Sequence, residues 1–196
     1  MAFVIDVRVR IPLAPRIKNT IRQEMKQKTD TIIAIDPDVE KSGVAVLDVD
    51  TRRVTAFSMT FPGLMDYLQG CRGTIVHEGK VLKVVVEAGW LNPSHWHITA
   101  RDSARMAARI GNSAGRNHEV GRKIAEMARH YGLDVDEVKP LRKCWRGKDG
   151  KITHEELRAI TGMPDRRTSQ DMRDAILLAW VYAGFPIGIN LKQTSL

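Results

Sequence analysis

Two short apolar runs that each end in an acidic residue place the tightest limit on what this 196-residue chain can fold into. The first run is Thr31-Ile-Ile-Ala-Ile-Asp36, and the second is Leu82-Lys-Val-Val-Val-Glu87. Continuous apolar runs of this length are typical of strands that are buried on both faces of a sheet. Each of these two carboxylates therefore lies where a buried strand ends.

The segments around these runs predict the element order β-β-β-α-β-α-β-α-α. Three strands form an antiparallel meander, and a helix that begins at Pro62 then leads through a right-handed crossover to a strand parallel to the first. The predicted strands cover residues 31–36, 43–49, 53–61, 82–87 and 133–138, and the later helices cover 102–110, 117–131, 153–162 and 169–183. We therefore expect an α/β domain with a five-stranded mixed sheet flanked by helices.

We expect residues 31–190 to form this domain, and residues 1–30 to be an N-terminal extension of unknown role. The extension has charged residues between short apolar pieces and no apolar segment of the signal-peptide kind. The longest stretch without charge, 175–191, is broken by two glycines and a proline, so it does not predict a membrane span. We expect a cytoplasmic protein with no membrane partner.

The charge balance favours a polyanionic partner. Lysine and arginine number 31 against 23 acidic residues, which gives a net charge of +8. Such an excess is typical of proteins that bind nucleic acid. Neither GxGxxG nor a phosphate-binding GxxxxGK[ST] loop occurs, so we expect no nucleotide cofactor. Cys71 and Cys144 stand alone without a CxxC motif, which argues against a cysteine zinc site and fits a reducing compartment.

Four acidic residues form the strongest chemical signal. If the first and fourth strands are parallel neighbours, Asp36 and Glu87 emerge at the same carboxyl edge of the sheet, where open α/β sheets place their ligand sites. Asp171 and Asp174 share one face of the last helix, whose apolar residues pack on the core. Four gathered carboxylates would suit a hard cation such as Mg²⁺ or Mn²⁺. Two such ions can activate water and stabilise the leaving oxygen in phosphodiester hydrolysis.

These residues stand in motifs that resemble a known family. Ile32-Ile-Ala-Ile-Asp36-Pro37, followed by Ser42-Gly-Val-Ala-Val46, resembles the first hairpin of the RuvC-type Holliday junction resolvases. Val84-Val-Val-Glu87 is similar to the second acidic strand of that family, and Gln170-Asp-Met-Arg-Asp-Ala175 to its closing helix. The resemblance covers residues 31–184 in the family's order. Asp38 stands where the family usually has glycine, and the segment after Glu87 differs, which suits a divergent or phage-type member.

The resemblance implies an RNase H-like fold and a homodimer that nicks both strands of a four-way DNA junction symmetrically. Mg²⁺ would be the cofactor, with Mn²⁺ able to substitute. Asp36, Glu87, Asp171 and Asp174 would be the catalytic metal ligands. We expect the dimer interface around Val120, Ile124, Met127 and Ala128.

Basic residues near these acids predict the surface that binds DNA. They occur on the two helical segments after Glu87 and in the loop 139–151. The predicted DNA-binding residues are Arg105, Arg109, Arg116, Arg122, Lys123, Arg142, Lys143, Arg146, Lys148 and Lys151. In the family, the corresponding helix and loop face DNA.

Several aromatic residues and histidines leave alternatives open. Trp90 and Trp96 follow Glu87, and we favour a small satellite core for them over a platform for stacking bases. His95 and His97 lack a third metal ligand, and His154 is a candidate accessory contact in the active site.

Two other functions stay open beside junction resolution. A nuclease of the same fold could act on RNA or on flap DNA. A non-catalytic nucleic-acid-binding module would have no reason to keep four uncompensated carboxylates. A nuclease assay on four-way, flap and duplex DNA separates the three.

Overall fold

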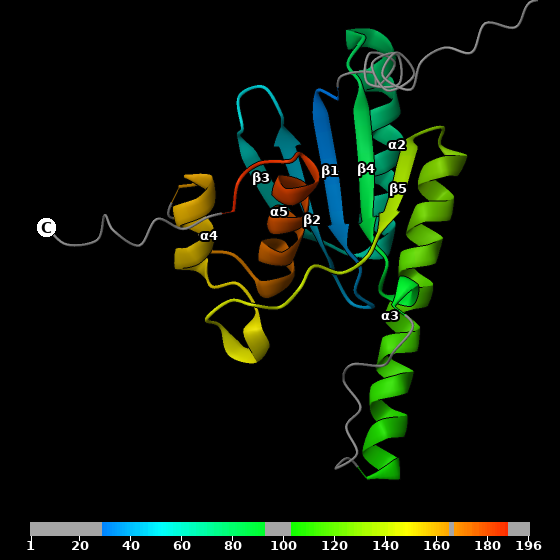
Figure 1. Ribbon diagram of the computed structural model, residues 1–196. Helices are drawn as coiled ribbons and strands as arrows, with labels where there is room; N and C mark the ends of the chain where they lie inside the picture. Colours follow the sequence, from blue (N-terminus) through cyan, green and yellow to red (C-terminus); the bar gives the residue numbers. More distant parts are fainter. Residues whose placement is uncertain (1–28, 93–102, 165–166, 188–196) are drawn as a thin grey trace, which may run out of the picture.

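Five strands form one mixed sheet in the computed structural model, which describes residues 29–92, 103–164 and 167–187 (Figure 1). The strand order is β3-β2-β1-β4-β5. The antiparallel meander comprises β1 (Thr31–Asp36), β2 (Ser42–Asp48) and β3 (Val54–Met59), and the strands parallel to β1 are β4 (Leu82–Glu87) and β5 (Asp134–Val138). The predicted strands and their pairing are confirmed, and this topology is that of the RNase H-like fold.

Helices cover both faces of the sheet. In Figure 1, α2 (Phe61–Glu78) and α3 (Ala104–His130) lie on one side, and α4 (His154–Thr161) and α5 (Gln170–Tyr182) lie on the other. Two single-turn 3₁₀ helices, η1 (Gly89–Leu91) and η2 (Lys148–Gly150), occur in the connections. Within the described part of the chain, no helix is both long and apolar enough to cross a membrane.

The alternation of side chains along β1 explains the two cores. Ile32 and Ala34 point to the face covered by α5, where Ile176 and Trp180 are buried. Ile33 and Ile35 point to the other face, which is covered by the buried side chains of α2 and α3. Because successive residues of a strand face opposite sides, an uninterrupted apolar run is what this central strand requires.

The helix α3 differs from the sequence-based expectation. We predicted two helical segments, over 102–110 and 117–131, but one helix runs from Ala104 to His130. Ser103 caps its start by accepting a hydrogen bond from the amide of Met106. Gly111 and Gly115 do not interrupt it, because a glycine inside a helix costs only about 1 kcal/mol relative to alanine. The N-terminal half of α3 projects well beyond the sheet (Figure 1).

The side chains that we expected at a dimer interface belong to the protein's own core. Ile124 and Ala128 on α3 are fully buried within the monomer. Val120 and Met127 are partly buried and pack against the same cluster. Ile124 and Ala128 are therefore not available for the expected interface, because this face of α3 already covers β4, β5 and α2.

The helix ends follow the predicted capping signals. Thr153 and Glu156 form the expected capping box at the start of α4, and Gly162 ends that helix in the left-handed conformation. Ser169 caps α5 by accepting a hydrogen bond from the amide of Met172. Most of the predicted extension 1–30, together with His95, Trp96, His97 and Arg101, lies outside the described residues.

Candidate active site

The pairing of β1 with β4 brings the first two acids together. The two strands are parallel, with Ile35 beside Val86. Asp36 and Glu87 each come one residue later, so both side chains lie at the same carboxyl edge of the sheet. The sequence predicts this proximity because both apolar runs have six residues and end in the acid.

A glycine in β2 lets the other two acids approach. Gly43 pairs with Asp36 across the β1–β2 ladder. A Cβ atom at Gly43 would lie only 2.1 Å from the backbone oxygen of Asp171, so the first turn of α5 packs directly on the strand. Only a residue without a side chain permits this approach. It sets Asp171 and Asp174 beside the edge that carries Asp36.

All four predicted acids line one cavity. Its volume is about 590 Å³, and Asp36, Glu87, Asp171 and Asp174 contribute to its wall. Asp38, a fifth carboxylate, also lines it. The carboxylates therefore come from three elements that are far apart in the sequence, β1, β4 and α5.

Burial and mutual repulsion disfavour the charged forms of these acids. Burial raises the pKa of Asp36 well above its ordinary value, and the charges of Glu87, Asp174 and Asp171 raise it further. Burial also raises the pKa of Glu87 to about 7, with the charge of Asp174 as the second cause. The pKa of Asp171 is raised by burial and then by the charge of Asp38. Positive charge supplied to the cavity would relieve this strain.

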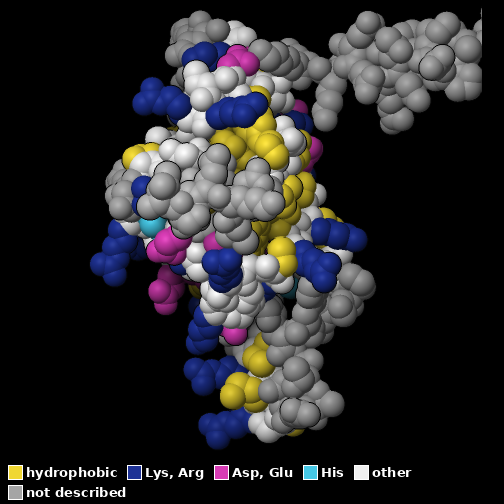
Figure 2. All heavy atoms as spheres, turned by 60° about the vertical axis from the view of Figure 1, so that its left-hand side comes forward, with side chains coloured by type: hydrophobic (Ala, Val, Ile, Leu, Met, Phe, Trp, Pro, Cys, Tyr) yellow, Lys and Arg dark blue, Asp and Glu magenta, His cyan; other side chains and the backbone are white. Residues whose placement is uncertain are grey.

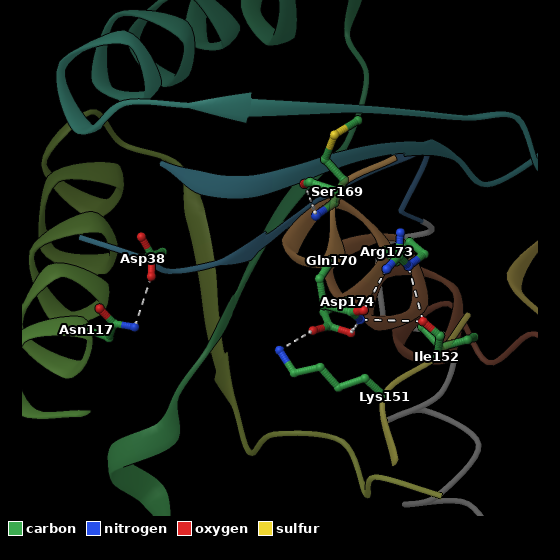
Figure 3. Close-up of polar contacts among 9 residues, drawn as sticks. Asp38, Asn117, Lys151, Ile152, Ser169, Gln170, Arg173 and Asp174 are labelled. Carbon is green, nitrogen blue, oxygen red and sulfur yellow. Dashed lines mark hydrogen bonds and ion pairs between the residues drawn. The ribbon is translucent and has the colours of Figure 1, made fainter. Parts of the chain in front are cut away.

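Two lysines already supply part of that positive charge. Lys151 Nζ lies 3.5 Å from Asp174 Oδ2 (Figure 3). Its charge lowers the pKa of Asp36, Glu87 and Asp171 against the larger raising effects. Lys143 also lines the cavity and lowers the pKa of Glu87.

The carboxylates of the cavity are the right kind of ligand for a hard divalent cation, but they are not already arranged around one ion-binding position. Carboxylate oxygens are the ligands that Mg²⁺ and Mn²⁺ prefer. Among the residues that the structure describes, however, no three acidic, histidine or cysteine side chains are close enough to share one ion. The acids line one cavity, and their side chains would have to move closer together to share a cation.

A polar pair links the β1–β2 turn to α3. Asn117 Nδ2 donates to Asp38 Oδ2 at 3.2 Å (Figure 3). The amide of Val39 donates to Asn117 Oδ1 at 3.3 Å. Asp38 Oδ1 accepts from the amide of Glu40 at 2.8 Å, which shapes the turn. Asn117 could not be predicted as a site residue from the sequence, because nothing local marks a partner 79 residues away.

Trp90 forms part of the cavity wall and is held by the fold. Its Nε1 donates to Glu137 Oε2 at 3.2 Å, and Arg122 lies 5.3 Å from its ring centre. A Cβ atom at Gly121 would lie 2.6 Å from the indole, so the ring is wedged against α3. These contacts favour the interpretation of Trp90 as a satellite core residue. Trp96 lies outside the described residues.

The predicted DNA-binding residues fall into two groups. Lys143 and Lys151 line the cavity, whereas the other basic residues do not. Successive residues of an α-helix are turned by about 100°. At this spacing, one face of α3 carries Arg105, Arg109, Arg116 and Lys123. Another face, roughly a third of a turn away, contributes Ile110, Ala114 and Asn117 to the cavity. Figure 2 shows Lys and Arg side chains along one edge of the projecting lower part of the molecule.

Five other predicted residues and His154 do not line the cavity either. Arg142, Arg146 and Lys148 are exposed in the loop between β5 and α4. That loop is well anchored, since the amide of Arg146 donates to both carboxylate oxygens of the buried Glu156. Arg122 and Lys123 lie 3.9 and 2.8 Å from Glu119 and Glu126. His154 Nδ1 lies 3.2 Å from Thr168 Oγ1.

Comparison with known proteins finds similarity to solved structures at low sequence identity. No protein-family model matches the sequence, and no curated protein matches it either. Among solved structures, the chain is similar to Thermus thermophilus RuvC in complex with a Holliday junction substrate, at 15% identity and a TM-score of 0.42 over 78% of this chain and 92% of that one. It is also similar to the Fowlpox virus resolvase bound to Holliday junction DNA, at 9% identity and a TM-score of 0.36 over 79% and 97% of the two chains.

A third similar structure is the large terminase nuclease of the thermophilic phage G20c, at 14% identity and a TM-score of 0.28 over 77% and 81% of the two chains. Two of these neighbours are Holliday junction resolvases, the class that the sequence motifs resemble, and identities and TM-scores are low throughout.

Proposed function

We propose that this protein is a metal-dependent DNA endonuclease that resolves four-way junctions by paired symmetric nicks. One observation carries the proposal: four carboxylates from β1, β4 and α5 line a single cavity at one edge of the sheet, with two lysines beside them. Residues 31–190 would form the nuclease domain. The ordered acidic motifs, which resemble those of RuvC-type resolvases, support the choice of the junction as substrate.

Asp36, Glu87, Asp171 and Asp174 are the proposed catalytic residues and metal ligands. When bound, two Mg²⁺ ions, or Mn²⁺ in their place, would activate water and stabilise the departing 3′-oxygen. Asp36 and Glu87 would contribute the ligands from the sheet, since they are the last residues of β1 and β4. Asp171 and Asp174 would contribute the remaining ligands from α5. The products would be nicks with 5′-phosphate and 3′-hydroxyl ends.

The basic side chains would hold the DNA around this cavity. Lys143 and Lys151, which line the cavity, would neutralise the phosphate that enters beside the acids. The exposed row on α3 and the exposed side chains of the loop between β5 and α4 would contact phosphates of the junction arms. Each chain has one such acidic cavity among its described residues, so two matched cuts require a homodimer with two-fold symmetry.

The test is cleavage of synthetic four-way, flap and duplex DNA and of an RNA–DNA hybrid in Mg²⁺. We expect the wild-type chain to nick the junction in a symmetric pair. Asp36→Asn should slow cleavage by several orders of magnitude, while junction binding is kept or improved because a negative charge near phosphate is removed. Asp66→Asn, an exposed acid on α2, is the matched control and should cleave normally. Undiminished cleavage by Asp36→Asn would refute the active site.

A further inference from the structure

Both carboxylate oxygens of Asp174 are engaged by neighbours on different elements. Gln170 Nε2 donates to Asp174 Oδ1 at 2.8 Å, one turn earlier on α5. Lys151 Nζ lies 3.5 Å from Asp174 Oδ2 (Figure 3). A carboxylate torsion has a broad energy minimum. The hydrogen bond from Gln170 therefore selects the rotation in which Oδ2 meets the cationic group.

The direction of the Gln170 amide is set by Arg173. Arg173 Nη2 donates to Gln170 Oε1 at 2.7 Å. A guanidinium group has only donors, so it must meet the oxygen of the amide and not its nitrogen. The amide nitrogen is then left to face Asp174 Oδ1. If the amide of Gln170 were flipped, its nitrogen would face the donors of Arg173 and its oxygen would face the carboxylate oxygen of Asp174, so both hydrogen bonds would be lost.

Arg173 is itself held by two backbone oxygens. Its Nη1 donates to the oxygen of Thr168 at 2.7 Å. Its Nε donates to the oxygen of Ile152 at 3.1 Å (Figure 3). Thr168 precedes α5, and Ile152 directly follows Lys151 in the chain. One guanidinium group therefore ties the start of α5 to the segment that carries the lysine.

We infer that Gln170 and Arg173 are positioning residues for the proposed metal site, with Arg173 acting on Asp174 through Gln170. This inference rests on the proposed function, because it assigns Asp174 Oδ2 as the oxygen presented to a cation. Arg173 stands between the two acids in the sequence, yet its guanidinium serves this network and not a phosphate. Hydrogen-bond partners of metal ligands affect metal affinity by about 10- to 100-fold when they are removed.

Direct binding of Mn²⁺ to the full-length chain tests the inference without relying on activity. Free Mn²⁺ is measured by electron paramagnetic resonance for the wild type, Gln170→Met, Arg173→Met and the double variant. We expect each single variant to bind Mn²⁺ about 10- to 100-fold more weakly. The double variant should bind no more weakly than the weaker single variant, since both changes break one relay. Arg53→Met, which removes an exposed arginine near the opposite end of the sheet, should bind like wild type.

A second readout separates positioning from loss of structure. The Mg²⁺ concentration for half-maximal cleavage should rise by the same factor in Gln170→Met, whereas junction affinity in EDTA stays unchanged. If Arg173→Met fails to fold, Gln170→Met alone decides the question. Wild-type affinity for Mn²⁺ in Gln170→Met, or additive losses in the double variant, would overturn the inference and leave the proposed function standing. A wild-type chain that neither binds Mn²⁺ nor cuts DNA would overturn both.

Discussion

Replacing Glu87 by glutamine should stabilise the metal-free protein at alkaline pH. Burial and the charge of Asp174 raise the pKa of Glu87 from 4.5 to about 7. Between these two values the folded state binds more protons than the unfolded state, so stability falls as pH rises through this window. Above about pH 8 the loss is complete, because Glu87 is then ionised in both states.

The size of the effect follows from the shift in pKa. One pKa unit corresponds to about 1.4 kcal/mol, so ionised Glu87 costs the fold about 3 kcal/mol. Glutamine keeps the shape of the side chain without the charge and should recover most of this free energy at pH 8. For a domain of this size, 1 kcal/mol corresponds to about 2–4 °C in Tm. Glu87→Gln should therefore melt about 6–12 °C above wild type.

Thermal unfolding in EDTA between pH 4 and pH 9 measures this difference. The wild type and Glu87→Gln should have the same Tm near pH 4, and the difference in Tm should grow between about pH 4.5 and 7. Glu40→Gln, which removes the same charge from an exposed turn, should show no gap at any pH. Added Mg²⁺ should narrow the gap by stabilising the wild type. A variant that is less stable than wild type at pH 8, or a gap independent of pH, would refute the electrostatic reasoning.

Three further predictions concern DNA binding, assembly and packing. Junction affinity should fall steeply with salt: log K against log salt should have a slope of roughly −5 if about six phosphates are neutralised. Replacing Arg142, Lys143 and Arg146 by alanine should reduce the magnitude of this slope by about 2–3. A wild-type affinity that does not change with salt would remove nucleic acid as a partner. Sedimentation at micromolar concentration should show a dimer, alone or with a junction, and a persistent monomer would favour a single-nick flap or RNA nuclease. Gly43→Ala should displace α5 and abolish cleavage, because its Cβ would meet Asp171 at 2.1 Å, and normal activity would contradict that contact.

The acids at the strand ends could be predicted because their signal is local. A strand that is buried on both faces needs a continuous apolar run, and the run ends where the chain reaches the sheet edge. Asp36 and Glu87 mark those ends, and both strands lie where the sequence places them. The capping residues Thr153 and Ser169 are equally local signals, since each side chain accepts a hydrogen bond from an amide three residues later.

The features that could not be predicted depend on contacts between distant segments. The Asp38–Asn117 pair joins residues 79 positions apart, and neither residue has a pattern that announces the other. The apolar positions of α3 predicted a buried face but not its partner, so a dimer interface and an intramolecular core were indistinguishable. Gln170 and Arg173 lie within the acidic motif, but only the folded arrangement shows their hydrogen bonds.

The packing of α5 explains how the fold tolerates four repelling acids. The helix buries Ile176, Leu177, Leu178 and Trp180 against β1 and β2. At about 1.5–3 kcal/mol for each large apolar side chain, this burial contributes roughly 6–12 kcal/mol. This gross gain is larger than the cost of about 3 kcal/mol for ionising Glu87, which is one of the four acids. The acidic turn of α5 is thus held beside Asp36 by the apolar residues that follow it, so the four acids line one cavity before any cation binds.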